Sequence, residues 1–150
     1  DPLEVRNDLR QGCSMAPVLF NLYMAAVFHT WKQRMEGVDG FGVDIRYNIN
    51  GQLMQKPRRT AVSDTVTECQ FADDSTLFAI SRSGLERAAV TFDEVASEFG
   101  LTVSLSKTKF MVIGRDISDA DLAPVCVGSN QIECVTEFRY LGSIIDTSGR

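Results

Sequence analysis

The chain has 150 residues, enough for one globular domain, and its composition of 44% hydrophobic and 23% charged residues excludes an intrinsically disordered protein. The formal net charge of −5 argues against a protein that binds nucleic acid through its overall charge. The charge is uneven, because residues 1–60 contain eight Lys/Arg and six Asp/Glu, whereas residues 61–150 contain seven and fourteen.

A long helix is predicted over residues 18–37. The preceding residues 5–17 are polar, contain a glycine and end at a proline, as expected for a loop that enters a helix. The helical segment is apolar almost all round, which predicts a largely buried helix, and Gly37 after several basic residues is typical of its C-terminus. The segment is not predicted to span a membrane, because polar residues interrupt it at Asn21, His29 and Thr30.

A β-hairpin is predicted next. Residues 43–49 alternate between apolar and polar side chains, as in a half-buried strand, and Asn50-Gly51 is a strong signal for a tight hairpin turn. A basic cluster follows at Lys56, Arg58 and Arg59, for which a solvated loop and a contact with nucleic acid are the two interpretations.

Two adjacent aspartates distinguish the following segment. Residues 65–71 and 75–80 are predicted as short strands on either side of an Ala-Asp-Asp turn that carries Asp73 and Asp74. One interpretation is an ordinary acidic turn, because aspartate side chains often bond nearby backbone N–H groups. The other is a metal site, because adjacent carboxylates repel each other unless a cation or solvent offsets the cost. A hard cation such as Mg²⁺ takes one or two carboxylates together with substrate phosphates.

The clearest helical pattern lies in residues 81–100. Ser83 and Glu86 have the spacing of a capping box at its start, and Gly100 is expected to end it. Apolar residues recur at spacings of three and four: Leu85, Ala88, Ala89, Phe92, Val95, Ala96 and Phe99.

Strands are predicted in the remainder of the chain. Residues 101–114 read as one strand, residues 123–135 as a hairpin that turns near Ser129-Asn130, and residues 136–146 as a final extended segment. The order of helices and strands predicts an α+β fold in which helices cover one side of a sheet.

The four cysteines lack a CxxC pair and His29 is the only histidine, so neither a zinc site nor a serine or cysteine triad is expected. Their wide spacing is typical of reduced, mostly buried thiols in an intracellular protein, with an oxidised pair as the alternative. The N-terminus is acidic and polar, unlike a signal peptide. We therefore expect an intracellular protein, in the cytoplasm or the nucleus.

Four sequence blocks resemble, in the same order, the palm region of reverse transcriptases of the non-LTR retrotransposon (LINE-like) type. "LRQGCSMAPVLFNLYM" resembles the QG-x-x-L-S-P-x-L-F-N block of that family, and "FADD" resembles its [YF]-x-D-D catalytic hairpin. "GLTVSLSKTKFMVIG" resembles the G-L-x-x-N-x-x-K-T-K segment, and "FRYLGSIID" resembles the F-x-Y-L-G block. The resemblance covers residues 9–146.

The resemblance implies a reverse-transcriptase palm-like α+β fold, with an antiparallel sheet that has helices packed on one face. Residues 1–150 would form a single partial palm domain, incomplete at both ends. The implied function is that of an RNA-directed DNA polymerase, which extends a DNA primer on an RNA template with dNTPs. The implied cofactor is Mg²⁺ in a two-ion site, and no membrane is implied.

The resemblance also assigns roles to individual residues. Asp73 would be the principal metal ligand and Asp74 its carboxylate neighbour, and both would be catalytic. Phe71 would take the place of the aromatic residue that packs beside the primer end.

Further positions are implied to bind nucleic acid or nucleotide. Gln11 and Gly12 would lie where a loop meets the template and the incoming nucleotide, since glycine lets backbone approach a ligand closely. Lys107 would lie near the triphosphate, where a cation offsets charge on the leaving group. A primer-holding hairpin would contain Tyr140, Leu141 and Gly142.

The sequence departs from the family pattern at three positions. Met15 and Ala16 stand where the family usually has Leu and Ser, and Ser104 stands where it usually has Asn. The family's third catalytic aspartate is expected upstream of Asp1 and its thumb after Arg150. With two carboxylates, residues 1–150 alone are expected to have little or no polymerase activity.

Two alternatives belong to other classes of function. The first is a retroelement-derived, non-catalytic module that binds nucleic acid or protein, which suits the acidic balance of residues 61–150. The second is a metal-free α+β domain in which the acidic hairpin only solubilises a turn.

Overall fold

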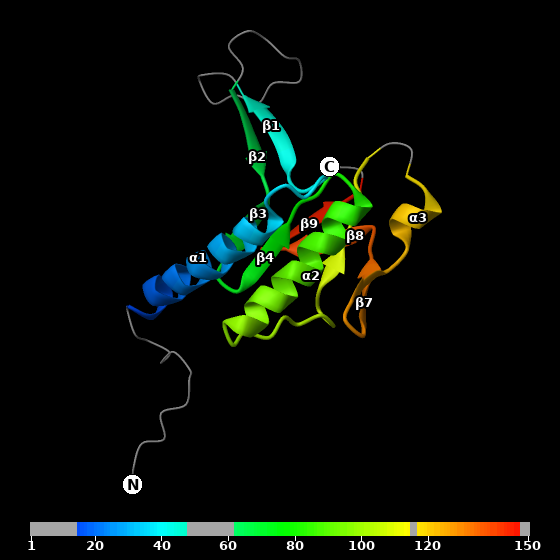
Figure 1. The fold of residues 1–150 in the computed structure, drawn as a ribbon. Coiled ribbons are helices and arrows are strands. Elements are labelled where there is room, and N and C mark those ends of the chain that lie inside the picture. The colour runs from blue at the N-terminus through cyan, green and yellow to red at the C-terminus, as the bar shows by residue number, and fades with distance from the viewer. Residues whose placement is uncertain (1–14, 48–61, 115–116, 148–150) are drawn as a thin grey trace.

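The structure is a computed structural model that describes residues 15–47, 62–114 and 117–147 (Figure 1). Helices and mostly antiparallel sheets occur together, so the predicted α+β class is confirmed. The elements follow one another as α1 (Ala16–Met35), β1 (Val43–Tyr47), β2 (Val62–Val66), β3 (Glu68–Phe71), β4 (Asp74–Leu77), α2 (Arg82–Glu98), β5 (Lys109–Phe110), α3 (Asp119–Leu122), β6 (Val125–Val127), β7 (Asn130–Cys134), β8 (Glu137–Tyr140) and β9 (Ser143–Asp146).

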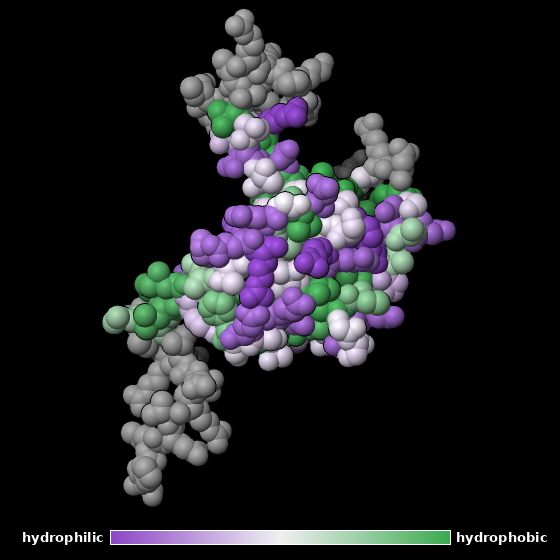
Figure 2. Space-filling model, viewed as in Figure 1, coloured by the Kyte–Doolittle hydropathy of each residue, from purple (hydrophilic) through white to green (hydrophobic). Residues whose placement is uncertain are grey.

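Helix α1 confirms the predicted long helix but not its predicted burial. Lys32 and Arg34 lie in its last turn, where the helix dipole favours cations. The buried stripe consists of Met24, Val27, Phe28, Trp31 and Met35. Apolar side chains at the start of the helix are half to two-thirds exposed: Met15, Val18, Leu19 and Leu22. The prediction of a largely buried helix is wrong, because the described residues cover only one stripe of a wider apolar surface (Figure 2).

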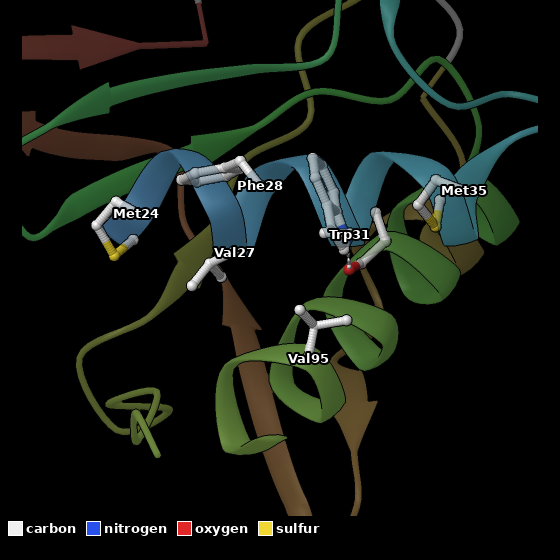
Figure 3. Packing of buried hydrophobic residues seen from close by; sticks show 7 residues of the cluster. Met24, Val27, Phe28, Trp31, Met35 and Val95 are labelled. Atoms are coloured by element: carbon white, nitrogen blue, oxygen red, sulfur yellow. Dashed lines mark hydrogen bonds between the residues drawn. The ribbon is translucent and has the colours of Figure 1, made fainter. Parts of the chain in front are cut away.

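The main core lies between α1 and α2, around Trp31 (Figure 3). The indole is fully buried, and its Nε1 donates a hydrogen bond to the Ala88 carbonyl at 3.0 Å. Three rings lie 5.0–5.8 Å from the indole, nearly perpendicular to it, as aromatic pairs prefer: Phe28, Phe41 and Phe92. Leu77 of β4 packs against the same cluster, so this core also fixes the acidic hairpin.

Helix α2 begins earlier than predicted. Its N-cap is Ser81, whose Oγ accepts a hydrogen bond from the Gly84 backbone N–H at 3.0 Å. The predicted capping box of Ser83 with Glu86 is therefore wrong. A Cβ at Gly84 would lie 2.3 Å from the Gly40 carbonyl oxygen, so only glycine allows the loop after α1 to pack so closely against this helix start. The predicted stop is confirmed, since Gly100 follows the helix with φ of +76°.

The other side of α2 packs against a second cluster, which contains Phe110, Val125, Val127 and Ile132. Arg82 links α2 to the chain before β6. Its guanidinium donates to the carbonyls of Asp121 at 3.2 Å and Pro124 at 2.7 Å, and also to that of Ala123. The same guanidinium lies 5.2 Å from the centre of the Phe110 ring, a cation–π contact. The pairs of adjacent apolar residues in the α2 sequence reflect these two buried faces. In one such pair, Ala88 belongs to the first cluster and Ala89 packs against the second.

Among the described residues, the strands form four separate small sheets rather than one. β1–β2, β3–β4, β6–β7 and β8–β9 are antiparallel pairs, whereas β5 pairs in parallel with β7. The prediction of a single sheet is therefore wrong for these residues, and so is the prediction that the pairing is antiparallel throughout. Figure 1 shows the β1–β2 hairpin projecting away from the helices.

Strand pairing also corrects two local predictions. β1 pairs with β2, and Tyr47 lies opposite Val62. In this register, the strand that pairs with β1 does not directly follow a turn at Asn50-Gly51. These two turn residues lie outside the described residues. Residues 101–114 are not one strand, because the backbone N–H groups of Lys107 and Thr108 both donate to Ser104 and close a turn. Only β5 remains extended and paired in this segment.

The hairpin predicted in residues 123–135 is confirmed as β6–β7. Its turn residues are Gly128 and Ser129, one position earlier than predicted, since Val127 lies opposite Asn130. Gly128 has φ of +58°, which glycine adopts without strain.

The cysteines differ from the prediction in burial. Cys69 and Cys126 are exposed and Cys134 is half-buried, and all three are free thiols. Burial was predicted from the wide spacing of the cysteines, but this spacing does not tell on which face of a strand a cysteine lies. Cys126, for example, is exposed between the buried Val125 and Val127. In the described part of the chain, no helix is both long and apolar enough for a membrane span.

Candidate active site

The acidic segment forms a tight hairpin. Phe71 at the end of β3 lies opposite Asp74 at the start of β4, which leaves Ala72 and Asp73 as the turn. Asp73 therefore lies in the turn as predicted, whereas Asp74 belongs to the strand. Both aspartates are exposed. Ala72 has φ of +53°, an uncommon value for a residue with a Cβ.

Strand pairing divides this hairpin into two faces, because opposite residues of an antiparallel pair project to the same side. The inner face includes Leu77, which packs on the core, and Glu68, which pairs with Lys32 of α1. The outer face contains two opposite pairs: Phe71 with Asp74, and Cys69 with Thr76. The helices thus cover one face, and the aromatic ring and the Asp74 carboxylate lie on the other.

Within the part of the chain that the structure describes, neither aspartate has a cationic partner. The ion pairs between described residues involve other carboxylates, and Asp73 and Asp74 take part in none of them. Two adjacent negative charges at an exposed tip attract a cation. Their oxygens are the ligands that a hard divalent cation prefers, so the pair fits Mg²⁺. Within the described residues, no group of three or more Asp, Glu, His or Cys could hold a metal ion.

Phe71 is unusually exposed for a large aromatic residue on a strand. Its relative exposure is 61%, and it lies directly opposite Asp74. Exposed aromatic side chains beside polar groups are common where a protein contacts a ligand. The ring and the carboxylate together form a surface with one apolar and one charged component.

Lys107 lies in the turn that follows α2, not on a strand. Its side chain is exposed and forms no ion pair with another described residue. The ammonium is available to an anion, but no contact within the described residues joins Lys107 to the acidic hairpin. Gln11 and Gly12 lie outside the described residues.

The last predicted extended segment is a second tight hairpin, β8–β9. Tyr140 lies opposite Ser143, so the turn residues are Leu141 and Gly142. Their φ values are +49° and +84°, as a type I′ turn requires. Tyr140 is half-buried and Leu141 is 51% exposed. The three residues assigned to a primer-holding hairpin therefore do lie on a hairpin.

Two interactions that connect elements of the fold involve residues for which no role was predicted. Arg82 could have been found from its i,i+4 spacing to Glu86, a common helical ion pair. The ion pair between Lys32 and Glu68 joins residues far apart in the chain, and the sequence carries no local signal for it.

Comparison with known proteins bears on the whole chain. The sequence model of the family described as "Reverse transcriptase (RNA-dependent DNA polymerase)" matches residues 2–145. No curated protein and no solved structure matches the chain.

Proposed function

Because the chain belongs to the reverse transcriptase (RNA-dependent DNA polymerase) family, we propose that it is part of the palm of a polymerase of the LINE-like type. The polymerase would extend a DNA primer on an RNA template by adding dNTPs. The observation that carries this proposal is the tip of the β3–β4 hairpin. There Asp73 and Asp74 are adjacent, exposed and without an ion pair among the described residues.

Asp73 and Asp74 would hold Mg²⁺ through their carboxylate oxygens. When bound, a pair of such ions supplies stabilisation of the attacking and leaving oxygens in an in-line phosphoryl displacement. Phe71 shares the outer face with Asp74 and would pack against the last base of the primer, which orients the primer 3′-hydroxyl. The reaction would be attack of this hydroxyl on the α-phosphate of a dNTP.

The remaining assigned residues would bind rather than react. Lys107 would offset negative charge on the triphosphate through its exposed ammonium. Gln11 and Gly12 would contact the template and the incoming nucleotide. The β8–β9 turn would hold the primer strand through Tyr140, Leu141 and Gly142.

Residues 1–150 alone would have little or no activity under this proposal. Within the described residues, Asp73 and Asp74 have no third metal-ligating side chain beside them. Two exposed carboxylates bind Mg²⁺ weakly, because this ion dehydrates reluctantly and demands near-octahedral geometry. Activity is therefore expected from the longest natural polypeptide that contains these residues.

The test is primer extension by that polypeptide with an RNA template, a DNA primer, dNTPs and MgCl₂. Extension is expected to depend on Mg²⁺ and to stop when EDTA removes the ion. Asp73→Asn keeps the size of the side chain and removes its charge, so the rate should fall by about 100-fold or more. Asp39→Asn is the matched control, since Asp39 is also exposed, in a turn and without an ion pair among described residues.

A second candidate function is a non-catalytic module derived from a retroelement, favoured by the excess of acidic residues in 61–150. This candidate predicts no extension by the wild-type protein and no effect of Asp73→Asn on any nucleic-acid binding. Binding to RNA with a steep salt dependence would separate it from a domain without nucleic-acid partners, because phosphate contacts release counterions.

A further inference from the structure

The base of the acidic hairpin is joined to α1 by an ion pair. Lys32 Nζ lies 2.6 Å from a carboxylate oxygen of Glu68, the first residue of β3. The Glu68 side chain is 17% exposed, and its other oxygen accepts a hydrogen bond from the Thr67 hydroxyl. The carboxylate is thus held from two sides.

The residue of the hairpin that forms this ion pair lies directly opposite the residue that anchors the hairpin by apolar contact. Glu68 lies opposite Leu77, and Leu77 packs on the core between α1 and α2. Both strands are therefore fixed to the helices at the base, β3 by the ion pair and β4 by apolar contact. From the base, the hairpin extends through Cys69–Thr76 and Gln70–Ser75 to Phe71–Asp74 at the tip.

The tip has weaker support. One side-chain hydrogen bond lies there among the described residues, from Gln70 Nε2 to the Ala72 carbonyl at 3.4 Å. The aspartates and Phe71 are exposed. The orientation of the tip relative to the helices thus depends on the anchors at the base.

Direct electrostatic action of Lys32 on the aspartates is small by comparison. Phe71 lies three positions after Glu68 along β3, which corresponds to about 10 Å at the usual rise per residue. That distance exceeds the Debye length of about 8 Å at physiological ionic strength, and Glu68 already balances the ammonium. The effect of the ion pair on the tip would therefore be mechanical.

We propose that Lys32 and Glu68 are positioning residues, which fix the acidic hairpin against α1 and thereby orient the Asp73–Asp74 tip. This inference rests on the proposed polymerase function for its kinetic consequence, but its structural part does not. An ion pair that is partly exposed contributes little to global stability, so the expected effect is local.

The chain contains a matched control pair. Arg34 lies two residues after Lys32 on α1 and forms a bidentate ion pair with Glu98 at 2.9 and 2.7 Å. The pKa of Glu98 lies below its ordinary value because the Arg34 guanidinium bonds its carboxylate. Arg34–Glu98 joins α1 to α2, and neither residue belongs to the hairpin.

The experiment compares three variants of the longest natural polypeptide. Two are the single substitutions Glu68→Gln and Glu98→Gln, and the third is a double variant that reverses the ion pair by combining Lys32→Glu and Glu68→Lys. Hydrogen exchange of the β3–β4 amides is measured first, since it needs no activity. Glu68→Gln should increase that exchange several-fold, the charge reversal should restore it, and Glu98→Gln should leave it unchanged. Single-nucleotide addition is measured second: Glu68→Gln should lower kcat about tenfold, with KM for the dNTP within twofold, because misplacement of catalytic groups lowers kcat.

The two readouts separate this inference from the proposed function. Unchanged hairpin exchange in Glu68→Gln, or an equal increase in Glu98→Gln, would overturn the positioning role even in an active polymerase. A wild-type protein that shows no nucleotide addition would overturn the proposed function, and the exchange data would still decide whether the ion pair fixes the hairpin.

Discussion

The two tight hairpins, β3–β4 and β8–β9, have the same length of turn but carry different chemistry. Position by position, Phe71 corresponds to Tyr140, Ala72 to Leu141, Asp73 to Gly142 and Asp74 to Ser143. Both turns begin with a residue that has a Cβ and a positive φ, +53° at Ala72 and +49° at Leu141. Gly142 continues the positive φ that a type I′ turn requires, whereas Asp73 is not at positive φ, so the two turns differ in backbone as well as in charge.

The two hairpins also differ in the residues that surround each turn. Gly142 suits the second position of a type I′ turn, whereas Leu141 does not suit the first, and exposed apolar residues follow the turn at Ile144 and Ile145. In the acidic hairpin, Ala72 has a positive φ although it has a Cβ, and Asp73 and Asp74 place two negative charges side by side. Residues that are unfavourable for the local stability of the fold are typical of functional sites.

The comparison is tested most strongly at Asp74 and Ser143, which occupy the same position in the two hairpins. Asp74→Asn should lower Mg²⁺-dependent primer extension by about 100-fold, because the charge that attracts the cation is halved. Ser143→Ala should change the rate by less than about threefold, since a single exposed hydroxyl makes a small contribution. Equal losses in the two variants would show that the hairpins do not differ in function. Circular dichroism of both variants checks that the fold is kept.

Local sequence signals were sufficient for α1 and α2 and for the location of the acidic turn, whereas the short helix α3 was not predicted. The spacing of apolar residues gives α1 and α2, and the family resemblance points to Asp73 and Asp74 before any geometry is known. The tertiary contacts that place these elements are not local. β1 pairs with a strand beyond residues 48–61, and the ion pair between Lys32 and Glu68 joins residues that are still further apart in the sequence.

Burial and exact pairing were the weaker part of the prediction. An apolar helix pattern does not say how wide a face its neighbours will cover, so the exposed start of α1 could not be foreseen. Likewise, the shared face of Phe71 and Asp74 depends on register, which the hydrophobic pattern of a short exposed hairpin specifies weakly. The N-cap of α2 is Ser81 rather than the predicted Ser83. The close contact of Gly84 with Gly40 at this helix start is tertiary, so the local sequence carries no signal for it.

A smaller effect is expected from the glycine that distinguishes the β8–β9 turn. Gly142→Ala should lower the free energy of unfolding by about 1 kcal/mol, because φ of +84° is strained for a residue with a Cβ. No neighbour lies within 4 Å of the added Cβ, so the loss would be conformational. Urea denaturation measures it as a lower midpoint at constant m-value. Gly114→Ala is the control, with equally open space and no positive φ, and should not destabilise the protein; equal losses would contradict the argument.

The smallest effect concerns the first turn residue of each hairpin. Leu141→Asn should raise the free energy of unfolding by about 0.5 kcal/mol, because asparagine tolerates positive φ and Leu141 is already 51% exposed. Ala72→Asn should give a similar gain in stability, since φ is nearly the same at both positions. Ala72→Asn should also lower the rate of extension, because it places an amide between Phe71 and Asp73. A gain in stability at Leu141 but none at Ala72 would mean that Ala72 is held by contacts at the tip rather than by turn geometry. The acidic hairpin would then be more rigid than its side-chain contacts suggest.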